Sequence, residues 1–558
     1  MSNILTPISL WSNFDVSLDI KAEIKSEVIS QGVKIEKITF LGRDTGNGRV
    51  KIAAAFASEP QTPVAGTVLI MPDSTQTIDE GLLKFIVKHG YAALMVDYRG
   101  EWEDCAFHTE YPENIAYANT AKCGRRKDYV DTNAQQTSWY EWAGVGLYAR
   151  KYITERTGSD NIALLGLRDG GEIVWKMGVA EQFSCIVPVC AAGWKAYAGI
   201  SKYLSKEISF DEERYRFIGG IDSQAYAPYV RCPVLMLCST NDERFDYDRA
   251  YDTFSRINAT YITGSAISYS VRGNSSVGAK SVSDMFLFLD KHLKKRQVFI
   301  PRPAEVAVEV DESSNLIAKI TPDNQGVVEE CNVYLSEDSM DSALRDWLVC
   351  PLQKKTEENV QTFFLNIYEK TSTIFVLCSV KYSNGFTVWS KMTVKKISGK
   401  FRNMQSRCRV LYSSDFGADG FSIADPVRNA LGGIFFTDAS LLPAIVEKAK
   451  GIKGLYCSSG LSTYRLNNPR FAPASGNMLA MDVYCDKTAS ISISVLDLNS
   501  GEEYINKVQI IGGVWQNTVL ESKAFKTASG VTLENFAFGM KLKITCAAEY
   551  AVNNVMWL

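Results

Sequence analysis

The segment NIALLGLRDGGEIVWKMGV, Asn161–Val179, decides the fold of the first half of this chain. Its apolar run, Asn161–Gly166, shows no alternation of apolar and polar residues, which indicates a strand buried on both faces, as in a parallel sheet. Gly166, Gly170 and Gly171 supply the small residues that a tight turn between a strand and a helix requires. The stretch that follows is periodic enough for a helix. The segment therefore predicts a strand, a sharp turn and a helix.

The same kind of apolar run recurs on both sides of this segment, with amphipathic stretches between the runs. The predicted strands are Thr67–Pro72, Ala92–Tyr98, Asn161–Gly166, Cys185–Cys190 and Pro233–Cys238. The predicted helices are Ile78–His89, Ser138–Thr154 and Val282–Leu293. Strands that alternate with helices are typical of an α/β fold with a mostly parallel sheet and flanking helices.

After this region the periodicity of the apolar residues changes to two. Two prolines, Pro301 and Pro303, mark a linker, and alternating strand patterns continue from there to the carboxyl end. The sequence thus predicts an N-terminal extension (1–34), an α/β domain (35–297) and two all-β sandwich domains (300–397 and 405–558). The last of these has the pattern of a jelly roll.

Length and composition exclude several classes of protein. The chain has 558 residues, too many for one hydrophobic core, and its 46% hydrophobic and 22% charged residues are those of an ordinary globular protein. A formal net charge of −3 gives no field that would hold nucleic acid or an anionic membrane. No long apolar run or basic leader is present, so we expect a soluble, cytoplasmic protein with a small-molecule or carbohydrate ligand. The oligomeric state stays open.

The cysteines and histidines limit the chemistry. Thirteen cysteines, without any C-x-x-C pair, predict reduced core residues rather than disulfides or metal ligands. We expect neither a metal nor a cofactor. Only three histidines are present, His89, His108 and His292.

The landmarks around the central segment resemble those of the α/β-hydrolase superfamily. The segment itself resembles the nucleophile elbow, and DYRG (Asp97–Gly100) and CPVLMLCSTNDERFD (Cys232–Asp246) resemble the loop after the fourth strand and the loop with the triad acid. YPENIAYAN, WYEWAGVGLYARKYI and CAAGW resemble the acetyl xylan esterase and dienelactone hydrolase branch. The resemblance implies that Asp242 stands at the acid position.

The residues that should complete the triad are missing. Arg168 stands at the nucleophile position, and arginine is permanently protonated. The loop expected to carry the base, RGNSSVG, offers Asn274 or Ser275 and no histidine. The sequence therefore predicts a degenerate triad, Arg168, Asp242 and Asn274, in which Arg168 forms an ion pair with Asp242.

The degenerate site leaves two functions open. In the first, the old pocket binds a carbohydrate, carboxylate or acyl ligand without hydrolysing it, through Arg168, Asp169, Asp73 and Asp242. In the second, the protein is an active esterase with a non-standard site, in which Asp169 is the nucleophile or His108 is the base.

The two all-β regions resemble known binding modules. Ser339–Trp347 followed by KYSNGFTVWS resembles a fibronectin-III-like module, and GGVWQ, DVYC and NNVMW resemble strands of galactose-binding-like jelly rolls. Their tryptophans, Trp347, Trp389, Trp515 and Trp557, are expected in the cores. The run of acidic residues from Asp242 to Asp252 predicts the capped start of a helix rather than a calcium site, because it lacks EF-hand spacing.

Overall fold

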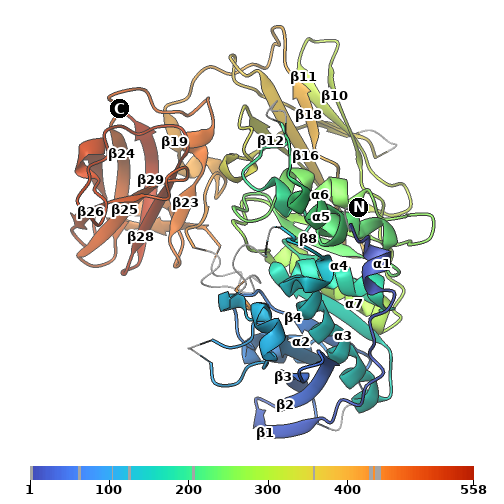
Figure 1. The fold of residues 1–558 in the computed structure, drawn as a ribbon. Coiled ribbons are helices and arrows are strands. Elements are labelled where there is room, and N and C mark those ends of the chain that lie inside the picture. The colour runs from blue at the N-terminus through green and yellow to red at the C-terminus, as the bar shows by residue number, and fades with distance from the viewer. Residues whose placement is uncertain are drawn as a thin grey trace.

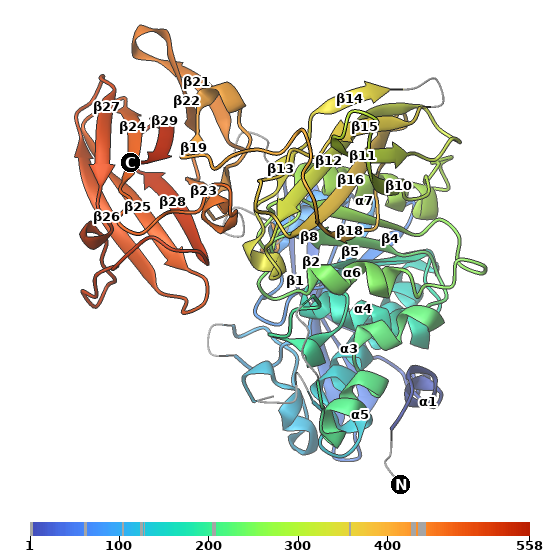
Figure 2. The ribbon, with the colours of Figure 1, turned by 90° about the horizontal axis from the view of Figure 1, so that it is seen from above.

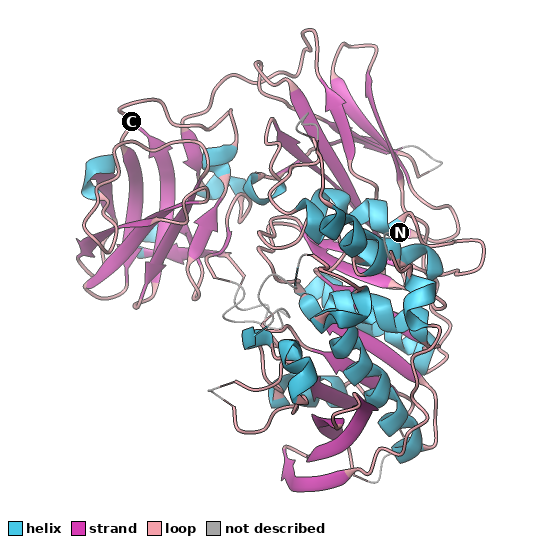
Figure 3. Cartoon of the chain, viewed as in Figure 1, coloured by secondary structure: helices cyan, strands magenta, loops and turns pink. Residues whose placement is uncertain are grey.

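The computed structural model describes residues 4–60, 64–102, 105–122, 127, 129–203, 208–355, 359–425, 431–433 and 442–558. Three regions follow one another along the chain, which we call the α/β part (α1 to α7), the middle β part (β10 to β18) and the C-terminal β part (β19 to β29). Figure 1 shows them in blue to green, in yellow and in orange to red. Figure 3 shows that the long helices belong to the α/β part.

The α/β part contains one mixed sheet of nine strands. The strand order is β1 (Glu23–Ser30), β2 (Val33–Asp44), β3 (Arg49–Ser58), β5 (Ala92–Asp97), β4 (Thr67–Met71), β6 (Ile162–Leu167), β7 (Cys185–Val189), β8 (Leu235–Ser239) and β9 (Ala266–Ser270). The pairs from β5 to β9 are parallel, whereas β1, β2, β3 and β5 pair antiparallel. All five predicted strands are present, and every residue of β4 to β9 is buried, as the continuous apolar runs require.

Helices flank this sheet. They are α1 (Pro7–Trp11), α2 (Glu80–Lys88), α3 (Ser138–Thr157), α4 (Asp169–Ala180), α5 (Glu212–Gly220), α6 (Tyr247–Phe254) and α7 (Ala279–Leu293). The three predicted helices correspond to α2, α3 and α7. The predicted helix start in the acidic run is also confirmed, because Asp246 is the N-cap of α6 and its side chain accepts a hydrogen bond from the backbone of Arg249.

The middle β part has two antiparallel sheets. One has the order β10 (Glu305–Val310), β11 (Leu316–Thr321), β15 (Gln361–Phe364) and β14 (Leu352–Lys355). The other has the order β13 (Leu348–Val349), β12 (Val328–Glu337), β16 (Thr373–Tyr382) and β17 (Thr387–Trp389), with β18 (Thr393–Lys396) paired to β16. Trp347 and Trp389 are buried, as predicted.

The C-terminal β part also has two antiparallel sheets. The first has the order β21 (Ala444–Lys448), β22 (Ile452–Tyr456), β29 (Tyr550–Trp557), β24 (Leu479–Cys485) and β27 (Gln516–Leu520), with β19 (Val410–Tyr412) paired to β29. The second has the order β20 (Ser422–Ile423), β23 (Leu461–Thr463), β28 (Met540–Cys546), β25 (Ala489–Asp497) and β26 (Glu503–Ile510). Trp557 is buried as predicted, whereas Trp515 is only partly buried.

The buried apolar residues form two hydrophobic cores, although the chain has three parts. Those of the α/β part and the middle β part form one continuous core, and Tyr269 of β9 meets Trp389 of β17 with ring centroids 5.7 Å apart. The C-terminal β part has a core of its own. Figure 2 shows this part set to one side of the other two. The twelve described cysteines are free thiols.

Candidate functional site

The candidate site begins at the turn between β6 and α4, where Arg168 has a strained backbone. Its φ of 50° and ψ of −108° lie outside the regions that residues with a side chain prefer. The turn is also closely packed: a Cβ on Gly166 would lie 2.3 Å from the Gly170 carbonyl oxygen, and one on Gly170 would lie 2.0 Å from that of Met71. The predicted sharp turn is therefore present, and a strain of about 1–3 kcal/mol is typical of functional sites.

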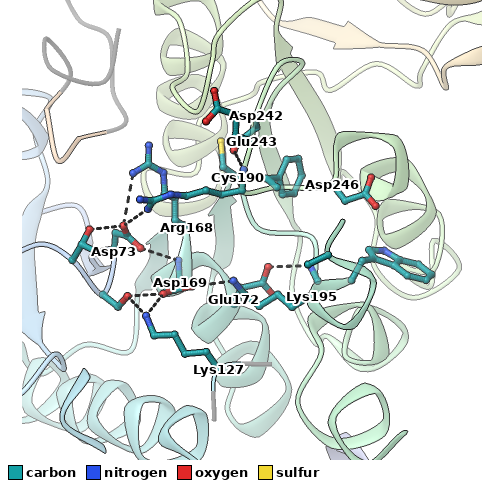
Figure 4. Close-up of a pocket in the computed structure, with 17 residues that line it drawn as sticks. Asp73, Lys127, Arg168, Asp169, Glu172, Cys190, Lys195, Asp242, Glu243 and Asp246 are labelled. Carbon is teal, nitrogen blue, oxygen red and sulfur yellow. Dashed lines mark hydrogen bonds and ion pairs between the residues drawn. The ribbon is translucent and has the colours of Figure 1, made fainter. Parts of the chain in front are cut away.

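A cavity of about 490 Å³ opens above this turn (Figure 4), a volume typical of sites for small molecules. Its lining comes from the segments that follow β4, β5, β6, β7 and β8, including the start of α4. The charged members of the lining are Asp73, Lys127, Arg168, Asp169, Glu172, Lys195, Asp242, Glu243, Arg244 and Asp246. The cavity thus lies at the carboxyl ends of the parallel strands, where ligand sites of open α/β sheets occur.

The Arg168 side chain points toward Asp73, as Figure 4 shows. Its Nη1 lies 3.7 Å from Oδ2 of Asp73, which is 2% exposed, and its Nη2 donates to the Ser275 carbonyl oxygen at 2.8 Å. The predicted ion pair between Arg168 and Asp242 is wrong, because the described contacts pair Arg168 with Asp73 instead. Oδ1 of Asp242 instead accepts hydrogen bonds from Ser275 and from the Arg244 backbone.

Asp242, at the expected acid position, faces a hydroxyl. The Ser275 Oγ donates to its Oδ1 at 2.7 Å, and the Arg244 backbone N–H donates to the same oxygen at 2.8 Å. Its Oδ2 is buried without a hydrogen-bond partner in the part of the chain that the structure describes. Burial raises the pKa of Asp242, although Ser275 and the Arg244 backbone lower it. Of the two residues that the base loop offers, Ser275 meets the acid, and neither Ser275 nor Asn274 is among the described residues of the cavity lining.

Asp169 lies in a different environment in the same cavity. Its Oδ2 accepts hydrogen bonds from Ser74 Oγ at 2.5 Å and from Lys127 Nζ at 3.1 Å, and its Oδ1 accepts one from Lys195 Nζ at 3.0 Å. Burial alone would raise the pKa of Asp169. The charges of Lys195 and Lys127 outweigh that effect and hold the pKa well below its usual range.

Sequence reasoning missed Ser74, Lys127 and Lys195, which surround Asp169. Ser74 is buried, and its Oγ also accepts a hydrogen bond from Lys127 Nζ at 2.7 Å. Burial lowers the pKa of Lys195, but Asp169 and Glu172 raise it more, so that the net shift is upward. The signal for Lys195 was its place directly after the CAAGW motif, at the carboxyl end of a strand.

A buried group of charged side chains, Glu172, Lys176 and Asp222, lies next to the cavity. Glu172 on α4 lines the cavity and accepts a hydrogen bond from the Gly193 backbone N–H at 3.0 Å. One helical turn further along, burial lowers the pKa of Lys176 to about 8 despite the nearby carboxylates of Glu172 and Asp222. The Lys176 ammonium lies 5.1 Å from the ring centroid of Trp139, a distance at which the ring stabilises a cation.

The three histidines lie elsewhere. His108 is partly buried, and its Nδ1 lies 2.8 Å from the Cys105 carbonyl oxygen. His89 stacks on Phe286, and burial lowers the pKa of His292 to about 4. No histidine is among the described residues that line the cavity.

Within the described ranges, His, Cys, Asp and Glu form no group of three or more that could hold a metal ion. The helices in those ranges are each too short or too polar to cross a bilayer.

Comparisons with known proteins give structural matches only. No family model matches the chain, and no curated protein matches it. Among solved structures, an acetyl xylan esterase from Paenibacillus sp. R4 is 13% identical over 51% of this chain and 92% of its own, with a TM-score of 0.39. Acetyl xylan esterase 1 from Thermoanaerobacterium sp. JW/SL YS485 is 13% identical over 49% of this chain and 89% of its own, with a TM-score of 0.36.

A putative dienelactone hydrolase from Klebsiella pneumoniae subsp. pneumoniae MGH 78578 is 13% identical over 50% of this chain and 100% of its own, with a TM-score of 0.30. These structures have hydrolase-type folds, and each match covers about half of this chain. Similarity at this level assigns no chemistry to the cavity, so its function has to be inferred from its own residues.

Proposed function

We propose that the cavity above Arg168 binds a neutral, polyhydroxylated ligand, such as a carbohydrate, and does not hydrolyse esters. One observation carries this proposal: the tip of the strained turn holds a guanidinium directed at Asp73, and Asp242 faces the Ser275 hydroxyl instead of an imidazole. An arginine cannot attack a carbonyl, and a serine hydroxyl accepts a proton poorly at neutral pH.

The charges of the lining favour a ligand with hydroxyl groups over an anion. Six carboxylates but only four cations line the described part of the cavity. Each of the four cations already lies within 4 Å of Asp73 or Asp169. An anionic ligand would therefore have to displace a carboxylate of the protein. A hydroxyl group can donate to these carboxylates and accept from the lysines without separating the existing pairs.

Calorimetric titration of the whole protein tests this proposal. The titrants are a panel of neutral sugars and, for comparison, acetate and benzoate. We expect a neutral sugar to bind and the two anions not to bind. Glu243→Gln, which changes an exposed carboxylate of the lining, should weaken binding of the sugar about tenfold, the usual scale for one hydrogen bond to a charged group.

Glu312→Gln is the matched control, because Glu312 is an exposed carboxylate on a turn of the middle β part. It should leave binding unchanged. Binding of the anions in preference to every sugar would contradict the proposed ligand class.

A second candidate function is hydrolysis with Ser74 as the nucleophile. The observation in its favour is the contact of Ser74 Oγ with Lys127 Nζ at 2.7 Å and with Asp169, since serine and lysine form the catalytic pair of some hydrolases. Against it, Lys127 forms an ion pair with Asp169 at 3.1 Å, and an ammonium in such a pair has no lone pair with which to accept the serine proton. Labelling of Ser74 by a fluorophosphonate probe would favour this second function.

A further inference from the structure

A second cavity, of about 390 Å³, adjoins the first. The two cavities share Ala198 and the five consecutive residues Asp242–Asp246, so that this loop is their common wall. Glu243 and Arg244 in this loop are exposed, and both line both cavities. A ligand that lies across the loop therefore contacts both sides of it.

The far side of the second cavity is built by the other two parts of the molecule. The middle β part contributes Asp341 and the short helix η8 (Ser342–Leu344). The C-terminal β part contributes Leu498 and Asn499, from the turn between β25 and β26. All three parts of the chain thus border one space.

The middle β part is fixed against the loop that divides the two cavities. Arg345, directly after η8, is buried and donates through Nη2 to Oδ2 of Asp248 at 2.8 Å. Asn241, directly before the loop, donates to the Arg345 carbonyl oxygen at 2.8 Å. These contacts hold η8 beside the loop, because separating a buried ion pair leaves an uncompensated charge.

Polar contacts also hold the C-terminal β part in place. Arg272, in the loop after β9, donates to Asp419 at 2.7 Å, and Asn468 donates to Asp346 at 3.1 Å. Arg272 is about 11% exposed and Asp346 is fully buried, so water screens these contacts weakly. The turn with Asn499 is therefore held near the second cavity through contacts outside it.

From this arrangement we infer that the ligand is a chain rather than a single unit: a neutral oligosaccharide whose one end lies in the first cavity and whose other units lie in the second, against η8 and Asn499. This inference rests on the proposed function of the first cavity. The second cavity has the chemistry for it, since its lining offers hydroxyl, amide and carboxylate groups from Ser201, Ser342, Asn499 and Asp341. It also gives the two β parts a role in binding.

The experiment measures affinity against ligand length with the full chain. Monosaccharides and oligosaccharides of increasing length from the cello-, malto- and xylo- series are titrated by calorimetry. We expect the longer members of one series to bind about 100-fold more tightly than their monosaccharide, which is the lower end of the gain from linking two binding events.

Asn499→Trp, which places a large side chain in the second cavity, should remove this gain and leave the affinity for the monosaccharide unchanged. Ser500→Trp is the matched control: Ser500 is also exposed, is the next residue, and is outside the described linings, so the gain should persist. Equal melting temperatures of the two variants exclude misfolding as the cause.

The outcomes separate this inference from the proposed function. Binding of a monosaccharide with no gain for longer chains overturns the inference alone. A gain that Asn499→Trp and Ser500→Trp leave equally intact also overturns it, because the additional units would then lie elsewhere. Absence of binding for every sugar overturns both.

Discussion

Asp169 and Asp242 line the same cavity but have opposite electrostatic environments. Asp169 accepts hydrogen bonds from Ser74, Lys127 and Lys195, and its pKa is lowered. Asp242 is more deeply buried, contacts a hydroxyl and a backbone N–H, and its pKa is raised.

The two carboxylates differ in the groups that face them. Asp242 faces a hydroxyl, and no imidazole is among the described residues that line the cavity. Asp169, in the same cavity, compensates the charges of two lysines, Lys127 and Lys195. This contrast supports the proposed binding of hydrogen-bonding groups over a proton transfer.

The largest expected effect is a gain of esterase activity in the double variant Arg168→Ser/Ser275→His. It places a hydroxyl on the strained turn and an imidazole where Ser275 now meets Asp242. We expect p-nitrophenyl acetate hydrolysis to exceed that of the wild type about 100-fold, the lower end of the contribution of a positioned base.

The two single variants are the controls, and each should stay at the wild-type rate, because each lacks one partner. A double variant that melts like the wild type but shows no gain would mean that Asp242 is not placed to orient an imidazole. The contrast between the two carboxylates would then say nothing about a lost triad.

The next effect is on stability. Asp169→Asn leaves Lys127 and Lys195 near each other without their common carboxylate. We expect a loss of about 2 kcal/mol, less than the about 3–5 kcal/mol for a fully buried pair, because the lysine side chains are 35% and 29% exposed. The loss is measured by denaturant unfolding. Asp242→Asn, matched in chemistry, should cost less at neutral pH; the reverse order would contradict the comparison.

The pH dependence of stability distinguishes the two carboxylates further. The folded-state pKa of Asp242 is raised, so the folded state binds more protons than the unfolded state at pH values between the unfolded and the folded pKa. The wild type should therefore lose stability as the pH rises through that window, and Asp242→Asn should lose less. For Asp169, whose folded pKa is lowered, the sign is opposite: its stabilisation is present above the unfolded pKa and is lost in acid.

Melting temperatures of the wild type and of both asparagine variants, taken from pH 2 to pH 8, check both signs, because the loss for Asp169 falls below the ordinary aspartate pKa. Parallel pH profiles for the two variants would show that the two carboxylates do not differ.

The smallest expected effect concerns Cys190, which lies beside Asp242. Its thiol is buried, and burial together with the Asp242 charge raises its pKa well above the usual value. Because the thiolate is the reactive form, we expect iodoacetamide to label Cys190 much more slowly than the partly exposed Cys105 and Cys546. Mass spectrometry of the peptides measures the rates. Labelling of Cys190 as fast as that of Cys105 would show that the Asp242 side of the cavity is open.

The strands and helices of the α/β part could be predicted well, because the sequence patterns that mark them are local. Apolar runs without alternation became the buried strands β4 to β8, and the three glycines around Arg168 predicted the strained turn. The place of Arg168 on that turn followed from the spacing of Gly166, Gly170 and Gly171, because the turn between β6 and α4 is short.

The partners of the site residues could not be predicted in the same way. Lys127 and Lys195 come from loops far apart in the sequence, and only tertiary packing brings them to Asp169. The choice between Asn274 and Ser275 failed for a related reason: Arg272, Asn274 and Ser275 all have left-handed backbones, so counting residues does not fix which side chain meets Asp242. Likewise, the prolines of the linker gave no sign that the middle β part shares a core with the α/β part.

The most direct test of the central claim is the initial rate of p-nitrophenyl acetate hydrolysis by the wild type, Ser74→Ala, Asp169→Asn and His108→Ala at neutral pH. If the cavity binds its ligand without a nucleophile and base, all four proteins hydrolyse the ester at the same rate, equal to that of an inert protein at the same concentration. A wild-type rate above that level which any of these substitutions abolishes would contradict the account.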